Sequence, residues 1–115
     1  MWKARRQNAI ELAKGKCEVC LQECKKPTVD HIIPERFLRR YFAGKDPHHL
    51  INIIVCDAKC HGAKTGIDRR FWRGPDLVGF VTELGLKNWP MGRVRLAFEF
   101  YGIRISKYEI DAVRN

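Results

Sequence analysis

The spacing of apolar and polar residues predicts two short strands that follow an N-terminal helix. The segment 2–14 places apolar residues on one side of a helix, and Gly15 is a suitable stop signal. The segments 28–33 and 51–55 are β-branched and apolar, which is typical of strands. Pro34 would end the first strand because proline lacks the backbone N–H that a ladder needs.

The remaining patterns favour helices. A short helix or turn is expected over 35–43, a longer helix over 60–70 and another over 75–88. The apolar residues of the segment 91–101 fit both the two-residue period of a strand and the 3.6-residue period of a helix, and we favour a helix there. A capping-box pattern that starts at Ser106 predicts one more short helix. Because no repeat or linker interrupts the 115 residues, we expect a single α+β domain.

The charge of the chain indicates a polyanionic partner. Lys and Arg total 22 and Asp and Glu total 13, so the formal net charge is +9. Such a field attracts nucleic acid, although a basic balance also serves solubility or an acidic protein partner. We expect no membrane span, because the sequence has no run of 18 apolar residues. No apolar signal region follows Met1, so a cytoplasmic location is expected.

Two close pairs of cysteines predict a metal site. In a reducing compartment, cysteines are metal ligands or free thiols more often than disulfides. Cys17 and Cys20 have the two-residue spacing that lets both thiolates reach one tetrahedral ion, and Cys56 and Cys60 offer a second pair. A structural Zn²⁺ held by these four sulfurs would supply on the order of 10 kcal/mol of folding energy.

Other interpretations of the cysteines remain open. They could be scattered thiols, or Cys17 and Cys20 could form a redox pair, although no thioredoxin-like unit surrounds them. Cys24 could replace Cys20 as a ligand, and His61 could replace Cys60.

Four polar residues lie between or just after the cysteine pairs and suggest hydrolytic chemistry. Asp30 and His61 could bind a hard divalent ion and leave positions for substrate and water. His31 could act as a general base, since an unperturbed imidazole has a pKa of about 6.5. Asn52 completes the set as a turn residue. Alternatively, Asp30 and His31 are a turn-forming pair without catalytic function.

These motifs resemble the HNH endonuclease family over roughly residues 17–65. The matching runs are VDHIIP at 29–34, LIN at 50–52 and CDAKCHGAKT at 56–65. The resemblance implies a ββα-metal core of the His-Me finger type, stapled by a four-cysteine zinc site and occupying about 17–70. Helices would flank this core at both ends, with a helical C-terminal extension over about 75–115.

The resemblance also implies a role for each residue. Asp30 and His61 would bind the catalytic ion, His31 would activate a water molecule, and Asn52 would hold the loop between the strands and orient His31. Where some members carry a further histidine, this chain has Thr65. The ion would therefore have two protein ligands, which favours Mg²⁺ or Mn²⁺. The expected products carry a 5′ phosphate and a 3′ hydroxyl.

Basic residues beyond the core are candidates for DNA binding. Arginine pairs with phosphate, and the candidates are Lys64, Arg69, Arg70 and Arg73. Lys64 could equally be a charge on a helix surface, and the arginines could be solvated. His48 and His49 are expected in a solvated loop, where one could contact phosphate or metal.

The sequence thus predicts a metal-dependent DNA endonuclease that nicks DNA or cuts both strands. The alternative is a non-catalytic zinc-binding nucleic-acid-binding module or an adaptor of a phage packaging complex. Small members of the HNH family often belong to phages or mobile elements. By that resemblance, the expected assemblies are a homodimer or a larger phage or host DNA-processing complex.

Overall fold

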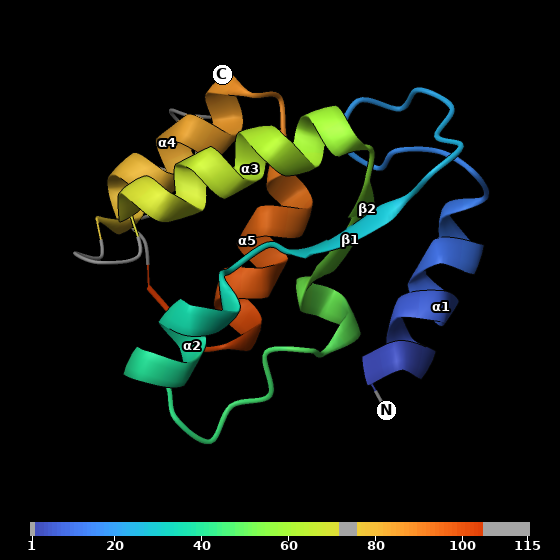
Figure 1. Ribbon diagram of the computed structural model, residues 1–115. Coiled ribbons are helices and arrows are strands. Elements are labelled where there is room, and N and C mark those ends of the chain that lie inside the picture. Colours follow the sequence, from blue (N-terminus) through green and yellow to red (C-terminus); the bar gives the residue numbers. More distant parts are fainter. Residues whose placement is uncertain (1, 72–75, 105–115) are drawn as a thin grey trace.

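The computed structural model describes residues 2–71 and 76–104, and its centre is one pair of antiparallel strands (Figure 1). Strand β1, Thr28–His31, pairs with β2, Ile53–Cys56, so that Thr28 lies opposite Cys56 and His31 opposite Ile53. The connection between them contains helix α2, Glu35–Tyr41, and the short 3-10 helix η1, Leu50–Asn52. Both predicted strands are confirmed, with bounds shifted by a few residues.

Helices follow and precede the strand pair as the sequence predicted. Helix α3 covers Ala58–Phe71, α4 covers Leu77–Leu86 and α5 covers Met91–Phe100. The ambiguous segment is therefore a helix, because Val94, Ala97 and Phe98 share one buried side. The helix predicted from Ser106 and the basic residue Arg73 lie outside the described residues.

Two helices lie against opposite faces of the strand pair. Helix α1, Trp2–Ala13, stacks Trp2 on His31, whereas α3 brings His61 to Asp30. Since neighbouring residues in a strand point to opposite faces, α1 and α3 occupy different sides of β1 (Figure 1). This arrangement places polar side chains from both sides near the C-terminal end of β1.

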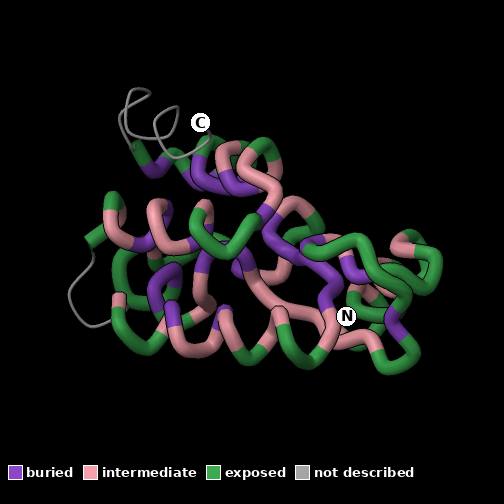
Figure 2. The backbone as a smooth tube through the Cα atoms, turned by 90° about the horizontal axis from the view of Figure 1, so that it is seen from above, coloured by how far each residue is buried: buried purple, intermediate pink, exposed green. Residues whose placement is uncertain are grey.

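The hydrophobic core lies between the segment after β1 and helices α3 to α5 (Figure 2). Its fully buried members include Ile32, Leu38, Ile67 and Leu84. Helix α1 differs: it has the expected bounds but no buried residue, and Leu12 is 69% exposed. The described chain is thus of the α+β class, and none of its described helices is long and apolar enough to cross a membrane.

Candidate functional site

Three cysteines and one aspartate form a group that could hold a metal ion such as zinc. The ligand atoms of Cys17, Cys20, Asp57 and Cys60 all lie within 4.8 Å of one another. The first two residues come from the loop after α1, and the other two from the start of α3. Thiolates joined by one carboxylate in so small a volume suit the tetrahedral coordination of Zn²⁺.

Hydrogen bonds prepare this group for a cation. The backbone N–H of Cys20 lies 3.4 Å from the sulfur of Cys17. Burial raises the pKa of Cys17, but the backbone N–H groups of Cys20, Asp57 and Val19 outweigh it, so that pKa is lowered. Burial and the neighbouring Cys17 thiol raise the pKa of Cys60. The negative charge of one thiolate therefore makes it harder for the neighbouring thiol to lose its proton. A cation bound between them would remove that repulsion.

Asp57 takes part in the group in a way that the sequence reasoning missed. Its Oδ1 accepts a hydrogen bond of 2.8 Å from the backbone N–H of Cys60, which caps the first turn of α3. Its Oδ2 lies 3.2 Å from the sulfur of Cys20. An aspartate three residues before Cys60 is a recognisable helix N-cap signal, but that signal does not reveal a second role.

Cys56 does not join the other three cysteines, which corrects the predicted four-cysteine set. Cys56 is still part of β2, and its sulfur lies 3.6 Å from the hydroxyl of the paired Thr28. Paired strand residues share one face of the sheet, and Thr28 and Asp30 share a face because they lie two residues apart in β1. Cys56 therefore lies on the face of Asp30, where it groups with Asp30 and His61. Cys24 is buried near Gly15 and is not a member of the group that contains Cys17.

The pair Asp30 and His61 forms the second candidate metal centre. Oδ2 of Asp30 and Nδ1 of His61 are 3.4 Å apart. Both atoms are buried and have no hydrogen-bond partner among the described residues. Buried polar atoms without a partner are costly, and a divalent cation between these two would satisfy both. The donor set therefore fits a cation.

A thiol also lies beside this pair. Burial raises the pKa of Cys56 to about 12, so its thiol is protonated near neutral pH when no metal is bound. Mg²⁺ and Mn²⁺ prefer oxygen and nitrogen donors to sulfur. With such an ion, Asp30 and His61 would be the ligands and water would occupy the other positions.

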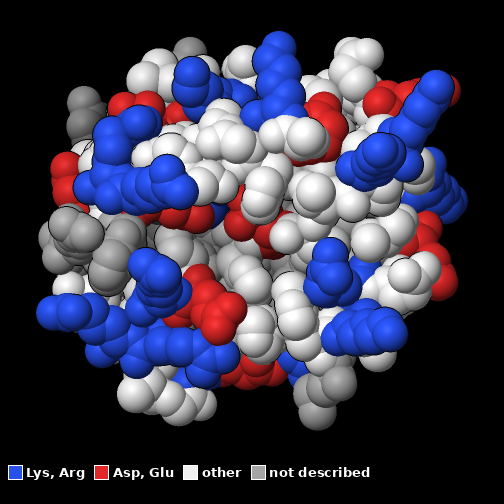
Figure 3. Space-filling view, in the orientation of Figure 1, with Lys and Arg blue, Asp and Glu red and all other residues white. Residues whose placement is uncertain are grey.

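A hollow of about 500 Å³ adjoins Asp30 and gives this centre room for a substrate. Figure 3 shows basic side chains around a central depression that contains acidic groups. The residues that line the hollow come from β1, α2 and α3 and the turn between β1 and α2; they are Asp30, His31, Pro34, Glu35, Arg36, Thr65, Asp68 and Arg69. A metal bound to Asp30 would therefore face a space that His31 also borders.

His31 is held by aromatic and imidazole contacts. Its Nε2 lies 2.9 Å from Nδ1 of His48. The ring of Trp2 stacks on both imidazoles, with centroid distances of 5.0 Å to His31 and 4.4 Å to His48. Burial lowers the pKa of His31, and the charge of His48 lowers it further. His31 is therefore neutral near pH 7, the form that can accept a proton.

Asn52 ties the segment after β1 to the loop before η1. Its side chain is fully buried; Oδ1 accepts from the N–H of Ile33 at 2.8 Å, and Nδ2 donates to the carbonyls of Ile33 and Pro47 at 3.0 Å each. Its own carbonyl accepts from Ile32 at 2.8 Å. These bonds fix the backbone that follows His31.

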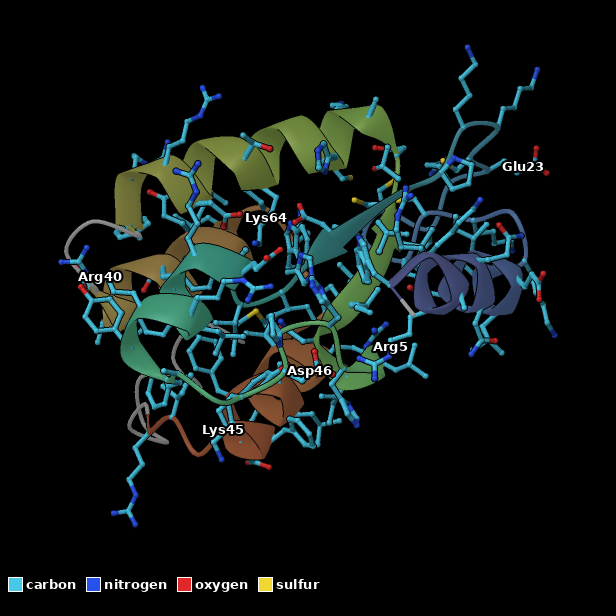
Figure 4. The ribbon with its side chains drawn as sticks, turned by 60° about the horizontal axis from the view of Figure 1, so that its bottom comes forward. Arg5, Glu23, Arg40, Lys45, Asp46 and Lys64 are labelled. Atoms are coloured by element: carbon cyan, nitrogen blue, oxygen red, sulfur yellow. The ribbon has the colours of Figure 1, made fainter. Side chains whose placement is uncertain are left out.

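Lys64 is buried, so it cannot be the surface phosphate contact suggested for it. Its side chain is 0% exposed and extends from α3 toward β1 (Figure 4). Its Nζ donates to the carbonyl of His31 at 2.8 Å and to Oδ1 of Asp68 at 2.7 Å. The ammonium also lies over the rings of Phe80 and Trp89. Lys64 thus anchors α3 to the end of β1 and positions His31.

Asp68 is a site residue that the sequence reasoning missed. It lines the hollow and lies seven residues after His61 on α3, a spacing that places both on one helix face. Burial raises its pKa to about 6, although the Lys64 ammonium beside it acts in the opposite direction. Only the helical spacing could have indicated it, and that spacing also fits a solvated position.

The other predicted DNA contacts differ in their positions. Arg69 lines the hollow. Arg70 lies 3.3 Å from the carboxylate of Glu83 on α4, so its guanidinium has an acidic partner. Arg36 borders the same hollow from α2. The structure thus brings Arg69 to the candidate centre with Asp30, His31 and His61, while Arg70 faces α4.

Comparisons with protein-family models, curated proteins and solved structures returned no match to this chain. The geometry of the two candidate metal centres is therefore the basis for a functional proposal.

Proposed function

We propose that the protein is a metal-dependent DNA endonuclease of the HNH type, which hydrolyses phosphodiester bonds. One observation supports this most directly. The carboxylate of Asp30 and the imidazole of His61 face each other at 3.4 Å through unpartnered buried atoms, beside a hollow that His31 also lines. A non-catalytic module has no need for a basic nitrogen next to a cation site.

Each residue has a distinct task in this proposal. Asp30 and His61 hold Mg²⁺ or Mn²⁺, which when bound stabilises the negative charge that develops on the phosphate and its leaving oxygen. His31, kept neutral by burial, accepts the proton of a water molecule in the hollow. Lys64 donates to the carbonyl of His31 and Asn52 accepts from the N–H of Ile33, so that both fix the backbone that follows the His31 ring.

The charge of the surroundings suits a DNA backbone. Arg36 and Arg69 border the hollow from opposite helices, and the whole chain carries a formal charge of +9. Guanidinium groups from these two helices would pair with a backbone phosphate that enters the hollow. The group of Cys17, Cys20, Asp57 and Cys60 supplies the structural Zn²⁺ site in this proposal, because it ties the loop after α1 to the start of α3.

The test is the conversion of supercoiled plasmid by purified protein in EDTA, Mg²⁺ or Mn²⁺. We expect metal-dependent nicking or linearisation, and we expect His31→Ala to lose about 10²- to 10⁴-fold in rate, the contribution typical of a general base. The matched control is His49→Ala, since His49 caps η1 and does not line the hollow. It should keep most of the activity.

The absence of cleavage with either metal, from folded protein that contains zinc, would contradict the proposal. Salt-sensitive DNA binding without cleavage would then indicate a nucleic-acid-binding module. A stable partner protein without DNA binding would indicate an adaptor. Equal losses in His31→Ala and His49→Ala would also contradict the role given to His31.

A further inference from the structure

We propose that His31, Glu35 and His48 form a second metal site that takes zinc or a similar transition metal and, when occupied, inhibits the nuclease. One ligand atom from each residue lies within 4.8 Å of the other two. None of the three belongs to the cysteine group or to the Asp30–His61 pair. The inhibition rests on the proposed function, whereas the metal site itself does not.

The three ligands come from separate segments that the fold holds in place. His31 ends β1, Glu35 begins α2, and His48 lies in the loop before η1. The backbone N–H of His48 donates to Oδ1 of Asp46 at 2.9 Å, and the carbonyl of Asp46 accepts from the Tyr101 hydroxyl at 2.6 Å. The His48 loop is therefore tied to the end of α5, so this ligand is positioned before a metal binds.

Contacts on the rings and on the carboxylate also limit movement. Trp2 stacks on both imidazoles. Arg39 donates through Nε to Oε2 of Glu35 at 2.7 Å. Such outer partners orient metal ligands and are a common feature of metal sites in proteins.

The distance between the imidazoles suits one tetrahedral ion. Two nitrogens bound to zinc at about 2.0–2.1 Å each lie about 3.3 Å apart. Nε2 of His31 and Nδ1 of His48 are 2.9 Å apart, so an increase of a few tenths of an ångström would admit the ion in place of the shared proton. The neighbouring hollow gives the ion a route of entry, because His31 and Glu35 both line it.

The donor types distinguish this site from the centre at Asp30. Two imidazoles with one carboxylate bind Zn²⁺, Ni²⁺ and Cu²⁺ far better than Mg²⁺, which prefers oxygen ligands and keeps its water. Mg²⁺ could therefore support cleavage while this second site stays free of it. A transition metal present at low concentration would bind here.

Occupation of the site would disable the base. A neutral imidazole has one basic nitrogen, and its other nitrogen carries a hydrogen. If Nε2 of His31 binds a metal, Nδ1 carries the hydrogen and no lone pair remains to accept a proton from water. Zinc would then inhibit Mg²⁺-supported cleavage without removing the ion from Asp30 and His61.

The binding test uses the fluorescence of Trp2, which stacks on both proposed histidine ligands. Zinc-containing protein is titrated with Ni²⁺, which quenches nearby indole. We expect saturable quenching that Trp2→Phe abolishes, although other tryptophans remain. His48→Ala and Glu35→Gln should each raise the half-saturating concentration at least about tenfold, the effect of losing one ligand contact of about 1.4 kcal/mol.

The matched control is His61→Ala, which removes a histidine of the Asp30 centre and should leave the Ni²⁺ titration unchanged. Circular dichroism on every variant checks the fold, and Glu35→Gln provides the result if His48→Ala does not fold. Quenching that is unaltered in both ligand variants, or that His61→Ala abolishes, would overturn the proposed site.

The activity test adds Zn²⁺ to the Mg²⁺-supported plasmid reaction. The unaltered chain should be inhibited, and Glu35→Gln should need about tenfold more Zn²⁺ for the same fractional inhibition of its own rate. Ni²⁺ binding without any nuclease activity would leave the metal site standing and refute the proposed function. Nuclease activity with no Ni²⁺ binding would refute the metal site alone.

Discussion

The cysteine group and the Asp30–His61 pair both use a residue from the first turn of α3, yet they differ in how many ligands the chain supplies and how far solvent reaches the site. Cys17 is fully buried, and each of the four ligands in its group comes from the chain. The Asp30–His61 pair provides fewer donors and adjoins a hollow of about 500 Å³, and the His61 side chain is 42% exposed. A closed set of ligands suits a structural ion, whereas open positions suit an ion that must meet substrate and water.

Neighbouring residues separate the two centres. Cys60 and His61 are adjacent on α3, and successive helical residues point about 100° apart around the axis. Cys60 therefore meets the loop after α1, while His61 meets Asp30 on β1. The first turn of α3 thus contributes one side chain to each of the two candidate metal centres.

Among the tests of this difference between the two centres, the substitution Cys17→Ser is expected to have the largest effect on stability. Loss of a structural ligand removes much of the metal-coupled folding energy, which is on the order of 10 kcal/mol for a whole site. We expect a chain that is unfolded or has lost its cooperative thermal transition, measured by circular dichroism. The control is Cys24→Ser, since Cys24 is also buried but lies outside the group. Similar unfolding in both variants would remove the special role of the Cys17 group.

An intermediate effect is expected from Asn52→Ala, which acts on the open centre. The substitution removes three side-chain hydrogen bonds in a fully buried place. At roughly 1 kcal/mol each, the free energy of unfolding should fall by about 3 kcal/mol, as measured by urea denaturation. The proposed cleavage should fall as well, because the backbone after His31 loses its support.

The control for this loss is Asn8→Ala, at an exposed position of α1, which should change stability by less than about 0.5 kcal/mol. An Asn52→Ala protein as stable as the Asn8→Ala protein would show that the loop does not depend on this amide.

The smallest effect concerns Asp68 and is a change of stability with pH. Its pKa is raised from 3.8 to about 6 in the folded chain, chiefly by burial. The folded carboxyl therefore holds a proton that the unfolded one has lost, and this stabilising contribution disappears as the pH rises through about 6. Between about pH 5 and pH 7.5, the chain should lose about 1 kcal/mol of stability relative to Asp68→Asn.

Denaturation of both proteins at each pH measures this difference, in which the effect of pH on the zinc ligands cancels. A constant difference, or one of opposite sign, would mean that the Lys64 ammonium dominates and keeps Asp68 ionised.

The described helices and strands were predicted well because each depends on the local spacing of apolar residues and on residues that end an element. The segment 91–101 fitted both a helix and a strand, and only tertiary packing decided between them, since Val94, Ala97 and Phe98 face the core from a helix. The group of Asp30, His31, Asn52 and His61 was predicted from order and spacing, and the structure places these residues around one strand end.

Side-chain direction at the junction of β2 and α3 was not predictable in the same way. Which of Cys56 and Asp57 reaches the cysteine group depends on where the strand stops and which residue caps the helix. Lys64 looked like a surface charge because a helical lysine usually is one. Its burial depends on an acceptor at His31, 33 residues away in the chain.

The most direct measurement compares Cys60→Ser with His61→Ala, two substitutions at adjacent positions of α3. Zinc content, circular dichroism and Mg²⁺-supported plasmid cleavage are measured on both. The account predicts that His61→Ala keeps its zinc and its fold but loses cleavage, whereas Cys60→Ser loses zinc and fold together. A His61→Ala protein that loses zinc and unfolds, or that still cuts DNA at the original rate, would contradict the separation of a structural centre from a catalytic one.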